Sequence, residues 1–325
     1  KRQVRIFCMS IFDTFVKSPL NYTGNKYRIL PQILPHFPQS IGTMVDLFCG
    51  GATVGLNTPC RKVLFVDNNP YVINLLQYLA SCRFDHLLCD LENLILQYGL
   101  SFSAQHSYAF YYQKQTDQVH RNNGLKEYNS QGFYQLREDY NALPDKTCER
   151  ANLLLYLLIV YGFNNDIRFS RDGYFNLPVG KTDLNKNNIR KLKAYIERVQ
   201  SILSDFICGD FRSEKIQHHI FSADFVYADP PYLITNAVYN ESHKWNLQTE
   251  QELLLLLDKM MQQHIPFALS NMIAKGQRKN VPLCNWINRH TDVQVFDIDF
   301  HYRGAYYNKK ERDGEREILI VPEYE

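Results

Sequence analysis

TMVDLFCGGATVGL, residues Thr43–Leu56, carries the strongest indication of the fold class. It begins as an apolar run typical of a buried strand, turns at Gly50 and Gly51, and ends in a pattern that favours a helix. A second apolar run, Lys62–Asp67, follows and ends on an acidic residue. Strand, glycine turn, helix and strand in this order are typical of a doubly wound α/β fold that binds a nucleotide.

Further apolar runs predict the remaining strands of the same sheet. Near-continuous apolar strands that alternate with helical patterns, notably Pro70–Ala80, indicate a mostly parallel sheet covered on both faces. Thr249 and Glu252 predict a capping box at the start of a later helix. The last two strands, joined by residues 301–314, predict an antiparallel end to the sheet. The expected strands are Thr43–Phe48, Lys62–Asp67, Asp224–Ala228, Pro266–Ser270, Val293–Phe300 and Arg316–Val321.

Residues 101–204 have a different character. Their first half is rich in Tyr, Gln, Asn and His, and a buried helix is expected at Ala151–Gly162. After a polar loop, an amphipathic helix is expected at Asn188–Ser204. We therefore predict a Rossmann-like α/β domain made of residues 1–100 and 205–325, with an inserted, mainly helical domain at 101–204. The apolar face of the amphipathic helix is expected to hold Ile189, Leu192, Ile196, Val199 and Leu203.

Composition narrows the function classes. Lys and Arg total 36 against 34 for Asp and Glu among 325 residues, so a polyanion would have to bind a local patch. The eight cysteines form no CxxC pair and have no His at metal-ligand spacing, which favours a reducing interior and no metal. The longest apolar stretch, about 13 residues at Ala151–Phe163, is too short for a membrane span, and residues 1–16 lack a signal-peptide block. We expect a cytoplasmic protein with no membrane partner.

The glycine turn predicts a nucleoside-like ligand. Asp67 ends its strand 16 positions after Gly51, where a carboxylate meets ribose hydroxyls in doubly wound folds. The turn lacks both GxGxxG and the lysine of a phosphate loop, which disfavours a pyrophosphate ligand and a nicotinamide dehydrogenase. A plain tight turn is the alternative interpretation.

ADFVYADPPY, residues Ala223–Tyr232, is more specific. A buried strand delivers Asp229 at its carboxyl end, and two prolines then remove two backbone donors and stiffen the loop. The Asp229 carboxylate and the carbonyl near Pro230 can both act as acceptors at one site, and Tyr232 supplies a ring for stacking. Two acceptors and a ring suit a planar group with an NH2, such as adenine or cytosine. An ordinary turn, with Asp229 as a cap, is the alternative.

The order of motifs, with NYTGNK at residues 21–26, the FCGG turn, an insertion and then DPPY, resembles the Dam-type DNA adenine-N6 methyltransferases. The resemblance extends from about Lys17 to Tyr324 and implies S-adenosylmethionine as methyl donor, without a metal. Lys26 matches a family residue near the carboxylate of the donor, and Asp67 matches the acid on the ribose. The implied catalytic loop is Asp229, Pro230, Pro231 and Tyr232, and the implied donor contacts are Tyr22, Lys26, Phe48, Gly50, Gly51, Asp67, Asp210, Phe211 and Asp229.

Tyr161–Lys181 resembles the target-recognition hairpin of the family. Arg168 matches an arginine that reads a base edge, but Asn165 and Asp166 depart from the Asn-Gly-Leu of members that methylate GATC, which puts that target in doubt. Residues 164–193 hold seven Lys or Arg and three Asp, which fits phosphate contacts or, alternatively, a solvated helix face. The implied DNA contacts are Asn165, Arg168, Arg171, Lys181 and, in HYRGAYYNKK, Tyr306.

The resemblance implies a site-specific enzyme that moves a methyl group from S-adenosylmethionine to a flipped-out adenine in double-stranded DNA. Its setting would be the cytoplasm of a bacterial or phage-infected cell, with a cognate restriction endonuclease as a compatible partner. Several alternatives remain open: an amine methyltransferase on RNA, on cytosine-N4 or on a protein amide, and a DNA-binding protein with an inactive domain. Cytosine-N4 ranks lower because its usual loop begins with Ser, whereas this one begins with Asp229.

Overall fold

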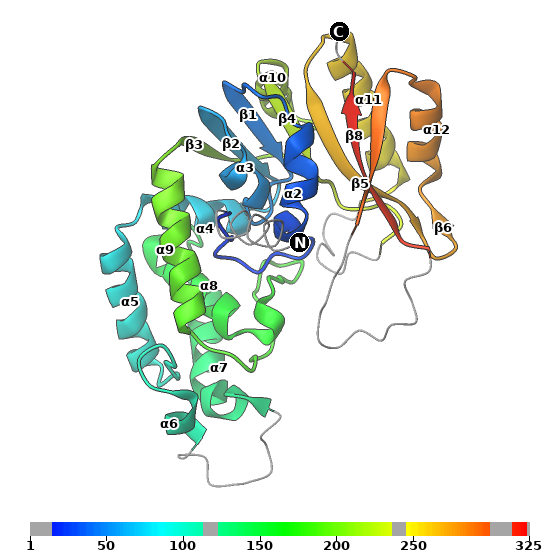
Figure 1. The fold of residues 1–325 in the computed structure, drawn as a ribbon. Helices are drawn as coiled ribbons and strands as arrows, with labels where there is room; N and C mark the ends of the chain where they lie inside the picture. The colour runs from blue at the N-terminus through cyan, green and yellow to red at the C-terminus, as the bar shows by residue number, and fades with distance from the viewer. Residues whose placement is uncertain (1–14, 113–122, 236–244, 300–313, 324–325) are drawn as a thin grey trace, which may run out of the picture. The chain divides into compact units, whose positions relative to one another are not determined.

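A computed structural model describes residues 15–112, 123–235, 245–299 and 314–323. By its contacts the chain divides into two compact units (Figure 1). The sheet unit combines Lys1–Phe15, Lys26–Asn69 and Ile202–Glu325, and the helical unit combines Val16–Asn25 and Pro70–Ser201.

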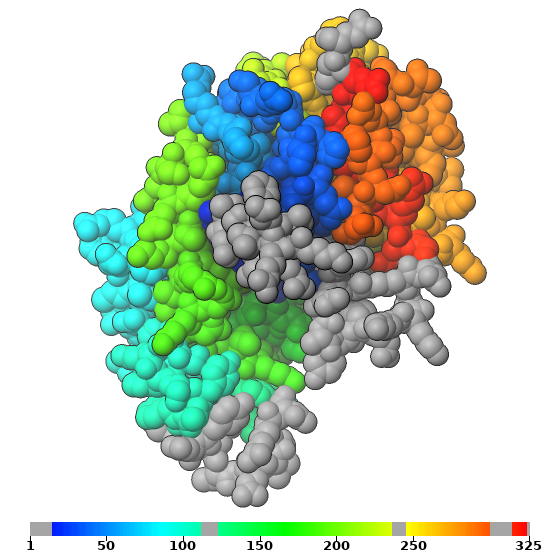
Figure 2. Space-filling model, viewed as in Figure 1, coloured from blue at the N-terminus to red at the C-terminus, as the bar shows by residue number. Residues whose placement is uncertain are grey.

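The sheet unit contains one mixed sheet of order β3-β2-β1-β4-β5-β8-β7, with β6 paired to β5. Strands β3, β2, β1, β4 and β5 run parallel, whereas β8 is antiparallel to both β5 and β7. Orange β7 and red β8 lie side by side at the surface in Figure 2. The predicted mostly parallel sheet with an antiparallel end is confirmed. The strands are β1 Thr43–Leu47, β2 Lys62–Asp67, β3 Leu203–Cys208, β4 Phe225–Ala228, β5 Phe267–Lys275, β6 Arg278–Lys279, β7 Val293–Ile298 and β8 Arg316–Pro322.

Apolar side chains cover both faces of this sheet, because neighbouring residues of a strand point to opposite sides. On one face Val45 and Leu47 pack in a core with residues of α10, α11 and α12. On the other face Met44 packs with residues of α2 and α3. The helical segments of this unit are η1 Lys26–Arg28, α2 Leu30–Ile33, η2 Leu34–His36, α3 Thr53–Asn57, α10 Glu214–Phe221, α11 Leu247–Gln262 and α12 Val281–Arg289.

Strand β3 was not predicted, and the helix expected to run to Ser204 ends earlier. Helix α9 ends at Gln200, and Leu203 opens β3 with 61% of its surface exposed, so its assignment to the apolar helix face is wrong. β3 is an edge strand with a half-exposed pattern, and therefore lacks the apolar run by which the other strands were recognised. Phe206 stacks on Phe65 of β2 at 5.0 Å between ring centroids.

The capping box predicted at Thr249 is also wrong. Helix α11 begins at Leu247, and its N-cap is Asn246, whose Oδ1 accepts from the Thr249 amide at 3.0 Å. The observed cap therefore lies three residues before the predicted one, because Asn is as good an N-cap as Ser or Thr. Glu250 in the first turn is buried and accepts hydrogen bonds from Asn271 and Asn280.

The helical unit is built around α8, whose residues are buried from Ala151 to Tyr161, as the predicted buried helix requires. α4, α5 and α7 contact α8, and α4 and α5 also contact α9. Because α4 and α5 make these contacts, the main segment of the unit is Pro70–Ser201, which starts before the predicted residue 101. The roles given to the two domains stay predictions. Among the described residues, every helix is too short or too polar to cross a lipid bilayer. The helices are α4 Pro70–Ser81, α5 Phe84–Gln97, α6 Tyr108–Tyr112, α7 Lys126–Ala142, α8 Glu149–Tyr161, η4 Phe163–Asn165 and α9 Lys186–Gln200.

Replacing the cap of α11 tests its assignment. Asn246→Ala removes the acceptor of the Thr249 amide and should lower the free energy of unfolding by about 1 kcal/mol. Thr249→Ala, the matched control, leaves that acceptor in place and should cost less than about 0.5 kcal/mol. Urea unfolding, with hydrogen exchange of the 247–251 amides, measures both. A larger loss for Thr249→Ala would contradict the assignment.

Candidate functional site

Three of the predicted groups meet at one edge of the sheet. β1 pairs with β2 through Leu47 and Val66, and with β4 through Leu47 and Ala228. The glycine turn, Asp67 and Asp229 therefore leave three adjacent strands at their carboxyl ends. The chain continues to β2 on one side of β1 and returns to β4 on the other, which makes this edge the topological switch point where open α/β sheets bind ligands.

The turn after β1 is tightly wound. Phe48 (φ 65°) and Ala52 (φ 63°) both adopt the left-handed conformation that non-glycine residues rarely adopt, and Gly50 (φ 48°) lies between them. The Cys49 amide donates to the Val66 carbonyl at 2.9 Å, which ties the turn to the end of β2. Strained backbone of this kind persists only where the surrounding structure holds it in place, and it is concentrated at ligand-binding and active sites. Gly51 is buried in the same turn.

Asp67 is fixed by the backbone around it. Its Oδ2 accepts from the Gly50 amide and its Oδ1 from the Asn69 amide, both at 2.9 Å. Burial raises the pKa of this carboxyl, and the hydrogen bonds oppose the rise. A carboxylate offers about four lone-pair positions, more than the amides of Gly50, Asn68 and Asn69 occupy, so Asp67 can still accept from a ligand hydroxyl.

Asp46, which the sequence reasoning did not single out, lies one residue before the end of β1. It is 2% exposed, and its Oδ2 accepts from the Gly55 amide at 2.9 Å. Burial, with smaller contributions from the Asp229 and Asp67 charges, raises the pKa of its carboxyl to about 7. Its position inside an otherwise apolar strand was the available signal, since a lone acid there seldom lacks a role.

Three aromatic rings gather beside the turn. Phe48, Phe211 and Trp245 are mutual neighbours, with centroid separations between 5.5 and 5.8 Å. Trp245 is anchored by its Nε1, which donates to Glu250 Oε2 at 2.5 Å. The sequence reasoning included Phe48 and Phe211 but missed Trp245, since a single Trp in a polar stretch carries no pattern. Asp210, next to Phe211, has both carboxylate oxygens bonded by Arg212.

The Asp229 loop forms an ion pair with the buried side chain of Lys26. Lys26 Nζ lies 2.7 Å from Asp229 Oδ2, although the resemblance placed Lys26 near the carboxylate of the donor. The Tyr232 hydroxyl lies 3.1 Å from Asp229 Oδ1 and 2.8 Å from Glu317 Oε1. Burial raises the pKa of Asp229, and the Lys26 charge opposes that rise. Pro230 is buried and Pro231 half-buried, so the prolines shape the loop without donating to it.

The sequence analysis did not identify Glu317 of β8. It is 6% exposed and lies 3.6 Å from Lys26 Nζ, so one ammonium group serves two carboxyls. Burial and the Asp229 charge raise the pKa of Glu317. The sequence offered one indication, a single acid in the apolar run after Arg316. That run does not show that Glu317 lies next to the DPPY loop.

Four of the predicted DNA contacts lie in the helical unit, as does Tyr22. These four are Asn165, Arg168, Arg171 and Lys181. Isolated bridges pair Gly162 with Val179 and Phe169 with Phe175, so the segment folds back on itself as a hairpin. Its base-reading candidate is Arg168, whose Nε donates to Asn176 Oδ1 at 2.7 Å.

The other candidates differ in their exposure to solvent and in their hydrogen bonds. Asn165 Nδ2 donates to the Val160 carbonyl at 2.5 Å, whereas Arg171 and Lys181 are exposed. Tyr306 and its HYRGAYYNKK stretch lie outside the described residues.

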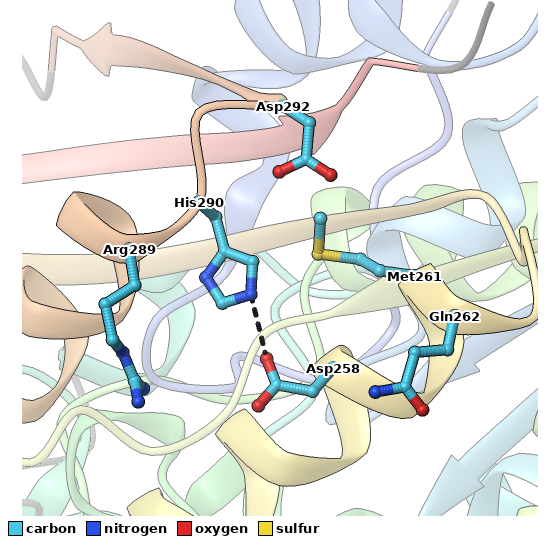
Figure 3. A pocket seen from close by; sticks show the side chains of 6 residues that line it. All are labelled: Asp258, Met261, Gln262, Arg289, His290 and Asp292. Carbon is cyan, nitrogen blue, oxygen red and sulfur yellow. Dashed lines mark ion pairs between the residues drawn. The ribbon is translucent and has the colours of Figure 1, made fainter.

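A shallow hollow elsewhere in the sheet unit does not qualify as the site. Asp258, His290 and Asp292 line it, and an ion pair of 3.2 Å joins His290 to Asp258 (Figure 3). Asp292 immediately precedes β7, whose first residue pairs with Pro322 at the far end of β8 from Glu317. The hollow therefore lies at the opposite edge of the sheet from Asp229. Within the described residues, His, Cys, Asp and Glu form no group of three that could hold a metal ion.

Comparisons with known proteins identify one family that the sequence matches. The sequence model of the D12 class N6 adenine-specific DNA methyltransferases matches residues 22–295. Type II methyltransferase M.FokI of Planomicrobium okeanokoites is 32% identical over 319 residues, which cover 95% of this chain and 43% of the relative. Modification methylase StsI of Streptococcus sanguinis is 32% identical over 314 residues, covering 94% and 43%. The chain thus spans less than half the length of these two relatives.

A further relative is similar in size. The DNA adenine methylase of Escherichia coli K12 is 26% identical over 257 residues, which cover 78% of this chain and 79% of the relative.

The raised pKa of Asp46 predicts a pH-dependent stability. A carboxyl with a folded pKa of about 7 and an ordinary value of 3.8 binds more protons in the folded state, so its contribution to stability is lost as pH rises from about 4 to 7. Asp46→Asn should therefore unfold with a free energy about 4 kcal/mol higher than wild type at pH 8, and equal to it near pH 4.

Urea unfolding across this pH range measures the difference. Asp205→Asn, on the exposed edge strand β3 with its side chain 56% exposed, is the matched control and should show no such pH dependence. Parallel curves for Asp46→Asn and wild type would contradict the assignment.

Proposed function

The chain belongs to the D12 class N6 adenine-specific DNA methyltransferases, and we propose that it transfers a methyl group from S-adenosylmethionine to the N6 amine of an adenine in double-stranded DNA. The observation that carries this proposal is the half-buried Asp229 carboxylate, held by Lys26 at the switch point of the sheet and followed by Pro-Pro-Tyr. The proposed setting is the cytoplasm of a bacterial or phage-infected cell.

The residues around the glycine turn fit S-adenosylmethionine. Asp67 presents a fixed carboxylate that can still accept from a ribose hydroxyl. Phe48, Phe211 and Trp245 offer apolar ring surface for the adenine of the donor, and Gly50 and Gly51 allow backbone to approach it closely. When bound, the donor supplies a methyl group on a positively charged sulfur.

The target amine is a poor nucleophile, because its lone pair is delocalised into the purine ring. Asp229 and the Pro230 carbonyl would accept hydrogen bonds from its two protons and favour a pyramidal nitrogen, whose lone pair then points at the methyl group. Fixed acceptors of this kind act by positioning, which supplies a large share of the acceleration in two-substrate reactions. The loop is suited to this because burial and the Lys26 pair hold the Asp229 carboxylate in one place.

The target base must leave the helix, since its amine cannot be reached inside a stacked duplex. The ring of Tyr232 would stack on the extruded adenine, while its hydroxyl stays bonded to Asp229 and Glu317. Stacking of a base on an aromatic side chain contributes about 1–3 kcal/mol.

The helical unit is proposed to recognise DNA. Arg168 would read a guanine edge, with Asn176 orienting its guanidinium group, and exposed Arg171 and Lys181 would contact phosphates. Asn165 has its amide nitrogen bonded within its own unit, so only its Oδ1 would be available to a base. The names of the relatives M.FokI and StsI, a Type II methyltransferase and a modification methylase, support a cognate restriction endonuclease as partner.

Removing the Asp229 carboxylate tests the chemistry. Asp229→Ala should lower methyl transfer to duplex DNA by about 10³-fold or more, because the amine loses its acceptor, while donor affinity changes only a few-fold. Labelled S-adenosylmethionine, mixed unmethylated duplex and modification-sensitive sequencing give the rate, the base and the site. Asp292→Ala, in the hollow at the opposite edge, is the control and should transfer normally.

The outcomes separate the alternatives. Normal turnover by Asp229→Ala would exclude this mechanism. No incorporation into DNA, with donor binding intact, would point to an RNA or protein acceptor, and methylated cytosine would identify the cytosine-N4 activity.

Arg168 provides a test of recognition. Arg168→Ala should lower kcat/KM by about 10–100-fold and relax the sequence requirement at one position, because a bidentate base contact discriminates by about 1–3 kcal/mol. Lys181→Ala, as a phosphate-contact control, should weaken all sequences equally and reduce the salt dependence of binding. Sequencing of methylated random duplexes reads out both. An unchanged target for Arg168→Ala, at wild-type rate, would remove Arg168 from the interface.

A further inference from the structure

A polar cluster joins the Asp229 loop to two buried residues outside it, and methyl transfer as proposed uses only part of this cluster. The cluster consists of Lys26, Asp229, Tyr232 and Glu317, which come from η1, the loop after β4, and β8. Lys26 is 4% exposed and Glu317 6%. Placing a second carboxyl here is costly unless it is paired, and positioning of the amine by Asp229 does not require it.

The Tyr232 hydroxyl joins the two carboxyls. Its oxygen lies within hydrogen-bond distance of both Asp229 Oδ1 and Glu317 Oε1, at 3.1 and 2.8 Å. A phenol carries one proton, so it donates to one carboxyl and can accept from the other only when that other carboxyl is protonated. The three groups therefore form a chain of two hydrogen bonds along which a proton can pass from Asp229 to Glu317.

The charges in the cluster favour such a transfer. Lys26 Nζ is 2.7 Å from Asp229 Oδ2 and 3.6 Å from Glu317 Oε1, so the ammonium group stabilises the ionised form of Asp229 more than that of Glu317. Burial raises the pKa of Glu317, the Lys26 charge opposes that rise from 3.6 Å, and the Asp229 charge adds to it, so the longer distance to Lys26 favours Glu317 as the resting place for a proton. Burial also raises the pKa of Tyr232, so the phenol stays protonated and passes one proton as it receives another.

Two other titratable groups face these acids. Tyr227 of β4 interacts with the charges of both Asp229 and Glu317, and its own pKa is raised by burial. Asp46 of β1 and Asp229 interact as like charges. The Tyr227 hydroxyl bonds to Ser270 Oγ at 2.7 Å, and Asp46 accepts from the Gly55 amide, so both groups act on these acids through their charges.

We propose that Glu317 is the final acceptor of the proton that the methylated amine releases, and that the Tyr232 hydroxyl carries this proton from Asp229; the inference rests on the proposed function. As the nitrogen–carbon bond forms, the sulfur–carbon bond breaks and its electron pair stays on sulfur. The nitrogen is left with a positive charge and one proton too many. That proton passes to Asp229, the Asp229 proton passes to the Tyr232 oxygen, and the former Tyr232 proton passes to Glu317.

The products of this sequence are a neutral methylated amine, an ionised Asp229 and a protonated Glu317. Glu317 acts through Tyr232 and does not touch the base.

Glu317→Gln tests the relay. Glutamine keeps the volume and an oxygen acceptor for the Tyr232 hydroxyl but does not take up the proton, so the single-turnover rate constant of methyl transfer should fall about 10²-fold. Donor and DNA affinities should stay within about twofold of wild type, because the binding residues are unchanged. Tyr232→Phe keeps the ring but lacks the hydroxyl, and Glu317→Gln combined with Tyr232→Phe should lose no more than the worse single variant.

The pH profile separates a relay from a structural role. In wild type, the rate should fall as pH falls through the raised pKa of Glu317, since a protonated Glu317 accepts nothing. In Glu317→Gln this acid limb should disappear, leaving only that of Asp229. Glu315→Gln, two residues earlier, where Glu315 pairs with Lys275 at 3.2 Å on the surface, is the matched control and should behave as wild type. A wild-type rate and profile in Glu317→Gln would overturn the relay.

A measurement that does not depend on methyl transfer distinguishes the relay from the proposed function. In carbon-13 NMR of glutamate-labelled protein, the Glu317 carboxyl is the signal missing from Glu317→Gln. Its pKa should fall in Asp229→Asn, which removes the neighbouring anion, and rise in Tyr232→Phe, which removes a hydrogen bond to the ionised form. A Glu317 pKa that is the same in wild type, Asp229→Asn and Tyr232→Phe would overturn the relay. A wild-type enzyme that leaves DNA unmethylated would overturn the proposed function instead.

Discussion

The parallel pairing of β1 with β2 on one side and β4 on the other is the constraint on which the candidate site depends. Because these strands are in register, the glycine turn, Asp67 and Asp229 leave the sheet at the same edge, although Asp67 and Asp229 are far apart in the sequence. Buried side chains on both faces of β1 fix this register, since a slip of one residue would exchange its two faces. In the proposed reaction, the methyl donor and the target amine would meet at this edge.

Burial of acids at that edge is the second organising feature. Asp46, Asp67 and Asp229 lie on neighbouring strands or just beyond them, and burial raises the pKa of each. Backbone amides stabilise the first two and Lys26 the third, so each acid has its own source of compensation. Shifted carboxyl pKa values are common in functional sites, where buried acids serve as acceptors in fixed positions. The cluster around Glu317 extends the same arrangement to β8.

The sequence predicted most of the sheet because each buried strand is a continuous apolar run. β2 has the predicted bounds, and β1 and β4 differ from them by one residue. β3 was missed because an edge strand with alternate exposure has no such run, and Leu203 happens to continue the spacing of α9. The cap of α11 was misplaced for a related reason, because Asn246 and Thr249 are both good caps and local pattern does not rank them.

The sequence by itself determined the α/β class, the acid at the end of β2 and the DPPY loop, because those signals are local runs of residues. Only the tertiary structure decided which side chains surround Asp229. Lys26 and Glu317 lie 203 residues before and 88 residues after it in the sequence, and neither stands in a pattern that points to the other. Trp245 joined Phe48 and Phe211 in the same way. Contacts across strands and loops depend on the register of the sheet and on burial, which a linear motif does not encode.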